Sequence, residues 1–246
     1  MLRRLALPLL LLGAAPLARA AGLQVSPVLV ELSRAEPRAT LVLKNLSDAP
    51  VRYEVTASAW DQAPDGEMRL APAPEMLVYP PLLEVAAREE RKIRVSTTAT
   101  FGDREQSYRV FIRELPPPET PAEKTGVRFL TKVGIPVFLM PPRPDLRAEI
   151  TGAAVHAGRL AVTLKNTGNT RLSPGKLKVE ALAQDGKAVS SLELDVWYVL
   201  AGGERALDLK LPAEGCARAR SLVVTAPVGG GSVRARVEAP GGVCAP

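Results

Sequence analysis

Hydrophobic and polar residues alternate with a period of two along much of the chain from Leu23 onward. Such alternation is typical of β-strands that bury one face, and it is clear at 39–43, 53–60 and 92–98. Residues that favour turns interrupt the pattern at strand-length intervals, at 47–50, 64–66, 102–103, 168–169, 185–186 and 202–203. Few stretches have a helical period. The pattern therefore predicts an all-β protein built from immunoglobulin-like β-sandwiches.

A run of prolines divides this pattern into two halves. Pro141, Pro142 and Pro144 follow a strand-like segment, and no periodic pattern continues through them. The halves also share a motif, because Leu-Val-Leu-Lys-Asn at 41–45 is echoed by Val-Thr-Leu-Lys-Asn at 162–166. At 246 residues the chain is long enough for two sandwiches. We expect these two domains at 21–141 and 146–246.

The first 20 residues have the composition of a signal peptide. Arg3 and Arg4 precede an apolar run at 5–12, and Ala18 and Ala20 are the small residues that a signal peptidase reads. The apolar run is too short to span a bilayer. We therefore expect cleavage after Ala20 and an exported mature chain.

The composition offers little for catalysis. The only histidine, His156, lies in a polar segment, and the chain lacks nucleophile motifs, phosphate-binding glycine loops and metal-ligand spacings. The sequence therefore predicts that the protein is not an enzyme and has no catalytic residues, metal, cofactor or small-molecule substrate. Export places the two cysteines, Cys216 and Cys244, in an oxidising compartment where they can pair as a disulfide.

Nucleic acid is also not expected as a partner. The net charge of +6 arises from 32 Lys and Arg against 26 Asp and Glu spread along the chain. Aromatic residues make up 4% of the chain, which leaves few platforms on which bases could stack.

The most unusual segment is 126–141. Val127, Phe129, Thr131, Val133 and Ile135 alternate there with Arg128, Leu130 and Lys132, after a proline-rich stretch at 115–121. A strand of this kind at a sheet edge can add itself to the sheet of another protein, where backbone hydrogen bonds give affinity and alternate side chains fill pockets. An ordinary interior strand of the first sandwich is the alternative interpretation.

Several segments, taken in order, resemble the periplasmic pilus chaperones of the chaperone/usher pathway, the PapD-like family. They are Leu-Gln-Val-Ser-Pro at 23–27, Leu-Lys-Asn-Leu-Ser at 43–47, Trp60, Val-Tyr-Pro-Pro at 78–81, Lys-Ile-Arg-Val at 92–95, the segment 105–116 and Gly-Ile-Pro-Val-Phe at 134–138. The resemblance covers nearly all of the first half and, more weakly, the second half through 158–166 and 197–202. Ser-Tyr-Arg at 107–109 together with 134–138 resembles the archaic branch of the family.

The resemblance implies two immunoglobulin-like domains arranged like a boomerang and a location in the periplasm. It also implies donor-strand complementation, in which the last strand of the first domain lends apolar residues to a pilus subunit that lacks one strand. The donor residues would be Val127, Phe129, Thr131 and Val133, with Ile135 as an extension. An outer-membrane usher would then receive the subunit. The exposed strand also predicts that the free protein self-associates through it.

Other site residues follow from the same resemblance. The best-known members bind the terminal carboxylate of the subunit with an arginine and a lysine, and these positions fall near Leu29 and Pro136 here. Arg109, with Lys132 second, is the candidate anchor in their place; a strand arginine with its head group in water is the alternative for Arg109.

The resemblance also matches a charged pair near the cleft between the domains. Arg94 and Glu105 are predicted to form this structural pair, although the acidic third member of the family's group is absent near Ala226. An exported structural or adhesive surface protein with tandem immunoglobulin-like domains is the alternative function.

Overall fold

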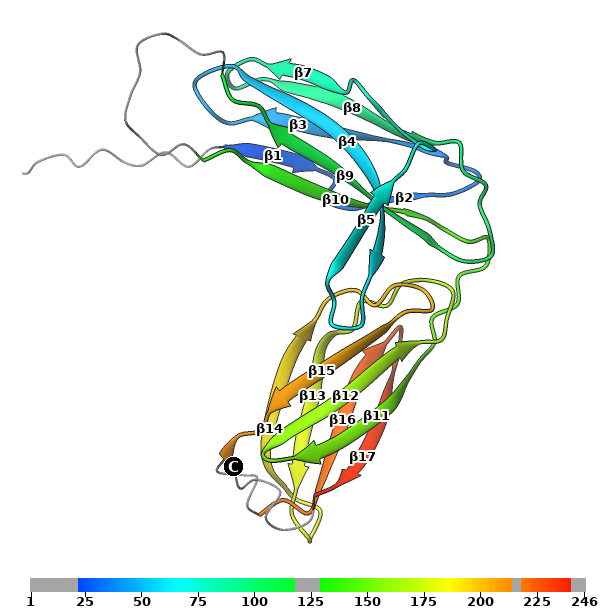
Figure 1. The fold of residues 1–246 in the computed structure, drawn as a ribbon, viewed down its shortest axis with the longest axis vertical. Helices are drawn as coiled ribbons and strands as arrows, with labels where there is room; N and C mark the ends of the chain where they lie inside the picture. The colour runs from blue at the N-terminus through cyan, green and yellow to red at the C-terminus, as the bar shows by residue number, and fades with distance from the viewer. Residues whose placement is uncertain (1–21, 118–128, 214–217, 240–246) are drawn as a thin grey trace, which may run out of the picture.

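A computed structural model of the chain describes residues 22–117, 129–213 and 218–239. The predicted signal peptide at 1–20, the donor residue Val127 and the cysteines Cys216 and Cys244 lie outside these ranges. The described residues form 17 strands arranged as two elongated domains that meet at an angle (Figure 1). The predicted all-β fold with two immunoglobulin-like domains in a boomerang arrangement is confirmed.

The first domain is a sandwich of two sheets that enclose one apolar core. Its strands are β1 (Leu23–Ser26), β2 (Val30–Leu32), β3 (Arg38–Asn45), β4 (Val51–Gln62), β5 (Met68–Pro72), β6 (Met76–Tyr79), β7 (Leu82–Val85), β8 (Glu90–Thr97), β9 (Gln106–Glu114) and β10 (Lys132–Leu139). One sheet has the order β1-β3-β8-β6, and the other has the order β2-β10-β9-β4-β5 with β7 paired to β4. Alternate residues of each strand supply the core, as Leu41 and Leu43 do on β3 and Val110 and Ile112 do on β9.

The second domain is also a sandwich of two sheets, and its two sheets together have fewer strands than those of the first domain. Its strands are β11 (Ala148–His156), β12 (Arg159–Asn166), β13 (Gly175–Leu182), β14 (Ala188–Val196), β15 (Glu204–Lys210), β16 (Ser221–Val228) and β17 (Gly231–Glu238). The sheets have the orders β11-β12-β15 and β14-β13-β16-β17. Leu160, Val162 and Leu164 of β12 are buried between them, because the period of two in this strand sends every second side chain inward.

The repeated Leu-Lys-Asn motif has the same structural role in both domains. Asn45 ends β3, and its side-chain amide donates to the carbonyls of Ala49, Val85 and Ala86. Asn166 ends β12, and its amide donates to the carbonyls of Thr170, Val199 and Leu200. Both asparagines are fully buried. Each one therefore satisfies the backbone of a polar corner that would otherwise bury unpaired carbonyls.

We predict that Asn45→Ala and Asn166→Ala each lower the free energy of unfolding by about 2 kcal/mol, because buried carbonyl groups lose their donor. Denaturant unfolding monitored by circular dichroism measures this change. Gln24→Ala is a control that removes a side-chain amide from an exposed position. Equal stabilities of Asn45→Ala and the unmodified protein would contradict the corner role.

The domains contact each other through backbone hydrogen bonds and side chains. The β4–β5 hairpin reaches the second domain (Figure 1), where the Ala206 amide donates to the Pro64 carbonyl at 2.8 Å. On another part of the interface, the Glu105 amide donates to the Asn169 carbonyl at 2.9 Å. These contacts fix how the second domain faces the first.

Arg171 of the second domain is the main charged contact between the domains. Its Nη1 donates to the buried carboxylate of Glu105 at 2.6 Å, its backbone amide donates to the same carboxylate at 3.1 Å, and its Nη2 donates to Glu31. Its guanidinium carbon lies 3.8 Å from the ring centroid of Phe138. Burial raises the pKa of Glu105, and the charge of Arg171 opposes that shift.

The predicted pairing of Arg94 with Glu105 is therefore wrong. Arg94 is an exposed residue of β8, in the sheet that does not contain β9, and its cross-strand neighbours are Thr40 and Tyr79. Glu105 precedes β9 and points to the second domain. The sequence places both residues in the first domain, but the partner of Glu105 comes from the second.

We predict that Glu105→Ala lowers the free energy of unfolding by about 3 kcal/mol, because it leaves Arg171 with a buried charge and one remaining partner. Glu31→Ala is the matched control. The Glu31 side chain is half exposed, so its loss should cost about 1 kcal/mol or less. Thermal and denaturant unfolding of both variants would measure the difference, and a Glu105→Ala protein as stable as Glu31→Ala would count against the ion pair as the main contact.

Candidate functional site

Part of strand β10 has an open edge. β10 pairs with β9 along its whole length, from Lys132 opposite Arg113 to Leu139 opposite Gln106. On the other side β2 pairs only with Val137–Leu139. Within the described part of the chain, the edge at 132–136 therefore has no neighbouring strand.

The ladder to β9 determines which backbone groups point outward from this edge. The Glu114 amide donates to the Thr131 carbonyl at 2.8 Å, so odd-numbered residues direct their backbone groups toward β9. The even-numbered residues Lys132, Gly134 and Pro136 direct theirs away from it. Proline is tolerated at Pro136 because its missing amide would have pointed outward. Free amides and carbonyls of this kind can pair with a strand of another protein.

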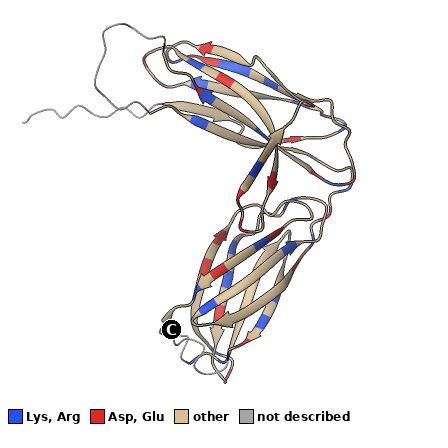
Figure 2. Ribbon diagram, in the orientation of Figure 1, with Lys and Arg blue, Asp and Glu red and all other residues tan. Residues whose placement is uncertain are grey.

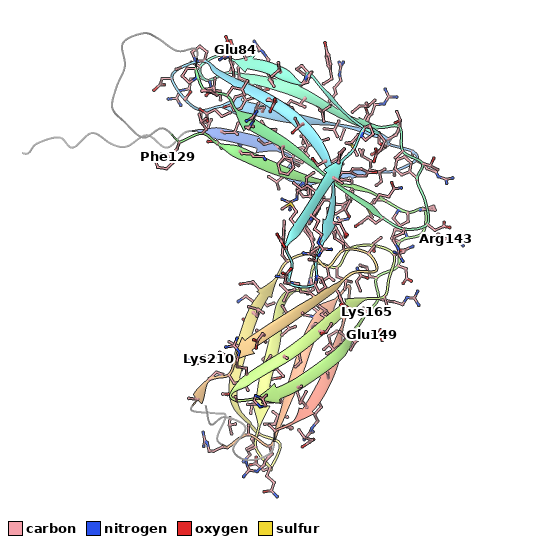
Figure 3. All side chains as sticks on the ribbon, in the orientation of Figure 1. Glu84, Phe129, Arg143, Glu149, Lys165 and Lys210 are labelled. Carbon is pink, nitrogen blue, oxygen red and sulfur yellow. The ribbon has the colours of Figure 1, made fainter. Side chains whose placement is uncertain are left out.

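The odd-numbered side chains of this segment change from exposed to buried along its length. Phe129 is 84% exposed, and Figure 3 shows it at the end of the first domain, away from the second domain. Thr131 is half-buried and Val133 packs against the core from its margin. Ile135 is 2% exposed and belongs to the core of the first domain. The predicted donor role of Ile135 is therefore corrected, because its side chain already fills the domain that would have to lend it.

The even-numbered side chains of β10 line the other face of the sheet. Lys132 is exposed, with its ammonium 4.4 Å from the ring centroid of Phe111. Gly134 lies opposite Phe111 in the ladder, and a Cβ there would come within 3.0 Å of Phe111 Cε1 and 3.4 Å of Arg109 Nη1. The absence of a side chain at Gly134 therefore leaves space for both neighbours. Phe138 continues this face toward the second domain.

Arg109 lies on the same face, on β9 directly opposite Pro136. Its guanidinium carbon is 4.3 Å from the ring centroid of Trp60 and 4.7 Å from that of Trp197. The residue is only 7% exposed. Burial lowers the pKa of Arg109, and the nearby Tyr198 opposes this shift.

The polar atoms of Arg109 are incompletely satisfied. Its Nε and Nη2 atoms are buried and have no hydrogen-bond partner among the described residues. Contact with two aromatic faces compensates part of the desolvation cost of the cation, but the donors themselves remain unused. A buried guanidinium of this kind is suited to an anion that can accept two parallel hydrogen bonds, such as a carboxylate.

Both domains contribute to the walls around Arg109. Trp60 of β4 packs with Phe138 and Leu200 in a small cluster between the domains. Trp197 and Tyr198 follow β14 of the second domain, and the Trp197 ring centroid lies 5.6 Å from that of Trp60 and 4.9 Å from that of Tyr198. The Trp60–Trp197 cluster, defined by Trp60, Arg109, Phe138, Trp197 and Tyr198, is therefore completed only when the two domains are together.

The sequence pointed to Arg109 and Lys132 through the resemblance, and the structure places both on the same face of the sheet formed by β9 and β10. Leu29, at a position where the best-known relatives have a cation, packs beside the aromatic cluster. The sequence did not predict that Trp197 and Tyr198 lie near Arg109. It also did not predict the ion pair between Arg171 and Glu105. The Trp-Tyr pair after a strand was a visible signal, but its position relative to Arg109 depends on the second domain.

Other kinds of site are not found in the described ranges. They contain no group of three or more His, Cys, Asp or Glu residues placed to hold a metal ion. They also contain no helix with the length and apolar character needed to cross a membrane. In Figure 2, positions of basic and acidic residues are interspersed along the ribbons of both domains.

The fold is that of a two-domain immunoglobulin-like protein whose first domain has an open strand edge at 132–136. Residues 22–144 match the family model for the N-terminal domain of PapD, described as a pili and flagellar-assembly chaperone. The chain therefore belongs to the PapD-like pilus-assembly chaperones. No curated protein sequence is detectably similar to it.

Solved structures have the same fold at low sequence identity. The chaperone in the CsuC-CsuE pre-assembly complex from archaic Csu pili of Acinetobacter baumannii is 18% identical, with a TM-score of 0.58 over 87% of this chain and 98% of that one. The class 5 fimbriae chaperone CfaA is 11% identical, with a TM-score of 0.59 and the same coverage. A chain of the Salmonella enterica SafA pilin complex with the SafB chaperone is 17% identical, with a TM-score of 0.55 over 89% of this chain and 97% of that one.

Proposed function

We propose that the protein is a periplasmic chaperone that stabilises pilus subunits by donor-strand complementation and delivers them to an outer-membrane usher. The observation that carries this proposal is the open edge of β10 at 132–136, which continues into the exposed side chain of Phe129. A subunit that lacks one strand exposes an apolar groove and unpaired backbone, both of which favour aggregation. The β10 edge would supply the backbone partners, and the side chains before it would fill the groove.

The proposed donor residues are Val127, Phe129, Thr131 and Val133. Burial along β10 supports this limit, because Ile135, Val137 and Leu139 are part of the first domain's own core. The segment thus has one end fixed in the core of the chaperone and, at Phe129, an apolar side chain that is exposed. Such a division allows the chaperone to stay folded before and after it lends the strand.

Arg109 is the proposed anchor for the terminal carboxylate of the subunit. It lies opposite Pro136, the position at which the best-known relatives have their lysine, so a cation on β9 would replace a cation on the neighbouring strand. Its unused Nε and Nη2 donors support the assignment. Lys132 is the second candidate, and its exposed ammonium on Phe111 is better suited to a contact along the subunit than to a buried carboxylate.

We predict that Phe129→Glu reduces recovery of the bound pilus subunit by about tenfold or more while the chaperone stays folded. A charge would have to enter the apolar groove of the subunit, whereas Phe129 is exposed in the free chaperone. Leu130→Glu, at the adjacent position of opposite phase, is the matched control and should retain the complex. Copurification from the periplasm followed by mass spectrometry measures both.

Loss of folding in Phe129→Glu, or equal loss of the complex in Leu130→Glu, would contradict the donor assignment. A tandem immunoglobulin-like adhesive protein, the alternative function, would yield no soluble one-to-one complex with a subunit.

We predict that Arg109→Met weakens capture of the subunit by about tenfold, the value of a charge-assisted hydrogen bond to a carboxylate. The free chaperone should be as stable as before or more stable, because the substitution removes a buried cation without a hydrogen-bonding counterion. Subunit recovery and denaturant unfolding measure the two effects separately. Lys92→Met, which removes an exposed cation from the other sheet of the first domain, is the control. Normal capture by Arg109→Met would exclude Arg109 as the anchor.

A further inference from the structure

Arg109 is buried in the free protein, so a ligand cannot reach its guanidinium without a local rearrangement. Its Nε and Nη2 atoms are buried, and the rings of Trp60 and Trp197 both contact the guanidinium. A carboxylate can accept hydrogen bonds from these atoms only after part of the surrounding cover moves, and these two rings are the aromatic part of that cover. The question of which ring moves rests on the proposed role of Arg109 as an anchor.

Trp60 is poorly suited to move. Its side chain is 4% exposed and is held by β4, one of the central strands of its sheet. Its ring centroid lies 5.8 Å from that of Phe138, and it packs with Leu200 in the cluster between the domains. Displacement of Trp60 would open the interdomain core.

Trp197 has the opposite properties. Its side chain is 55% exposed although one face covers Arg109. Its backbone is held on both sides, since Val196 is the last, buried residue of β14 and Val199 bridges to Leu172 with hydrogen bonds in both directions. The indole can therefore rotate toward solvent while the chain that carries it remains in place.

We propose that Trp197 is a lid on the anion site of Arg109. Its indole covers the guanidinium in the free chaperone and rotates outward when a peptide carboxylate binds. The cation–π contact is then exchanged for charge-assisted hydrogen bonds to the carboxylate. Because the lid belongs to the second domain and the cation to the first, the site is controlled by contact between the domains.

Chemical modification of arginine tests the lid without any subunit. Phenylglyoxal reacts with accessible guanidinium groups, and peptide mapping by mass spectrometry assigns each adduct. Arg109 should react slowly in the unmodified protein and about tenfold faster in Trp197→Ala, as expected for the loss of a desolvated cation–π contact. Trp197→Phe, which keeps a ring over the guanidinium, should react more slowly than Trp197→Ala.

Arg171 is the internal control, because it also lies on an aromatic ring between the domains but is paired with Glu105. Its reactivity should be the same in all three proteins. Unchanged reactivity of Arg109 in Trp197→Ala would overturn the lid. An equal increase at Arg171 would overturn it too, because Trp197 would then simply hold the domains together. Normal subunit capture by Arg109→Met would refute the anchor but leave the result on the lid unaffected.

Discussion

The structure depends above all on how Arg171 joins the two domains. Its guanidinium contacts a buried carboxylate, a second carboxylate at the surface and the ring of Phe138, all three from the first domain. Each sandwich has its own apolar core, so the cores alone leave the angle between them undetermined. The ion pair, together with the backbone hydrogen bonds beside it, places the end of β14 next to β9. The Trp60–Trp197 cluster around Arg109 is a consequence of that placement.

The sheet that contains β9 and β10 combines two features that oppose stability in isolated proteins. An open strand edge invites aggregation, and a buried cation without a counterion costs free energy. Both occur on the same sheet, one at the edge of β10 and the other on β9 beside it. Exposed Lys132 and the missing amide of Pro136 make the edge less suitable for indiscriminate pairing, whereas Trp60 and Trp197 shelter the cation. These features are consistent with a protein that binds one class of partner reversibly.

The sequence predicted the fold well because the relevant signals are local. Alternation identified the strands, and the repeated Leu-Lys-Asn motif indicated two corners that the structure shows to be equivalent. The resemblance indicated Arg109 as a candidate anchor. It could not show that the Nε and Nη2 atoms of Arg109 have no hydrogen-bond partner among the described residues. Ile135 was misassigned because the alternation of apolar and polar residues is the same in the exposed part of the segment and in the part whose side chains fill the core of the first domain. Arg94 was misassigned as the partner of Glu105 because the true partner, Arg171, lies in the other domain.

Donor-strand complementation requires the open edge of β10 to form backbone hydrogen bonds with a bound subunit. Hydrogen–deuterium exchange of the Lys132 and Gly134 amides measures this pairing, since both amides point away from β9. We predict fast exchange of both amides in the free chaperone and strong protection in the purified complex with a pilus subunit. Equally fast exchange in the complex and in the free protein would contradict donor-strand complementation by this edge.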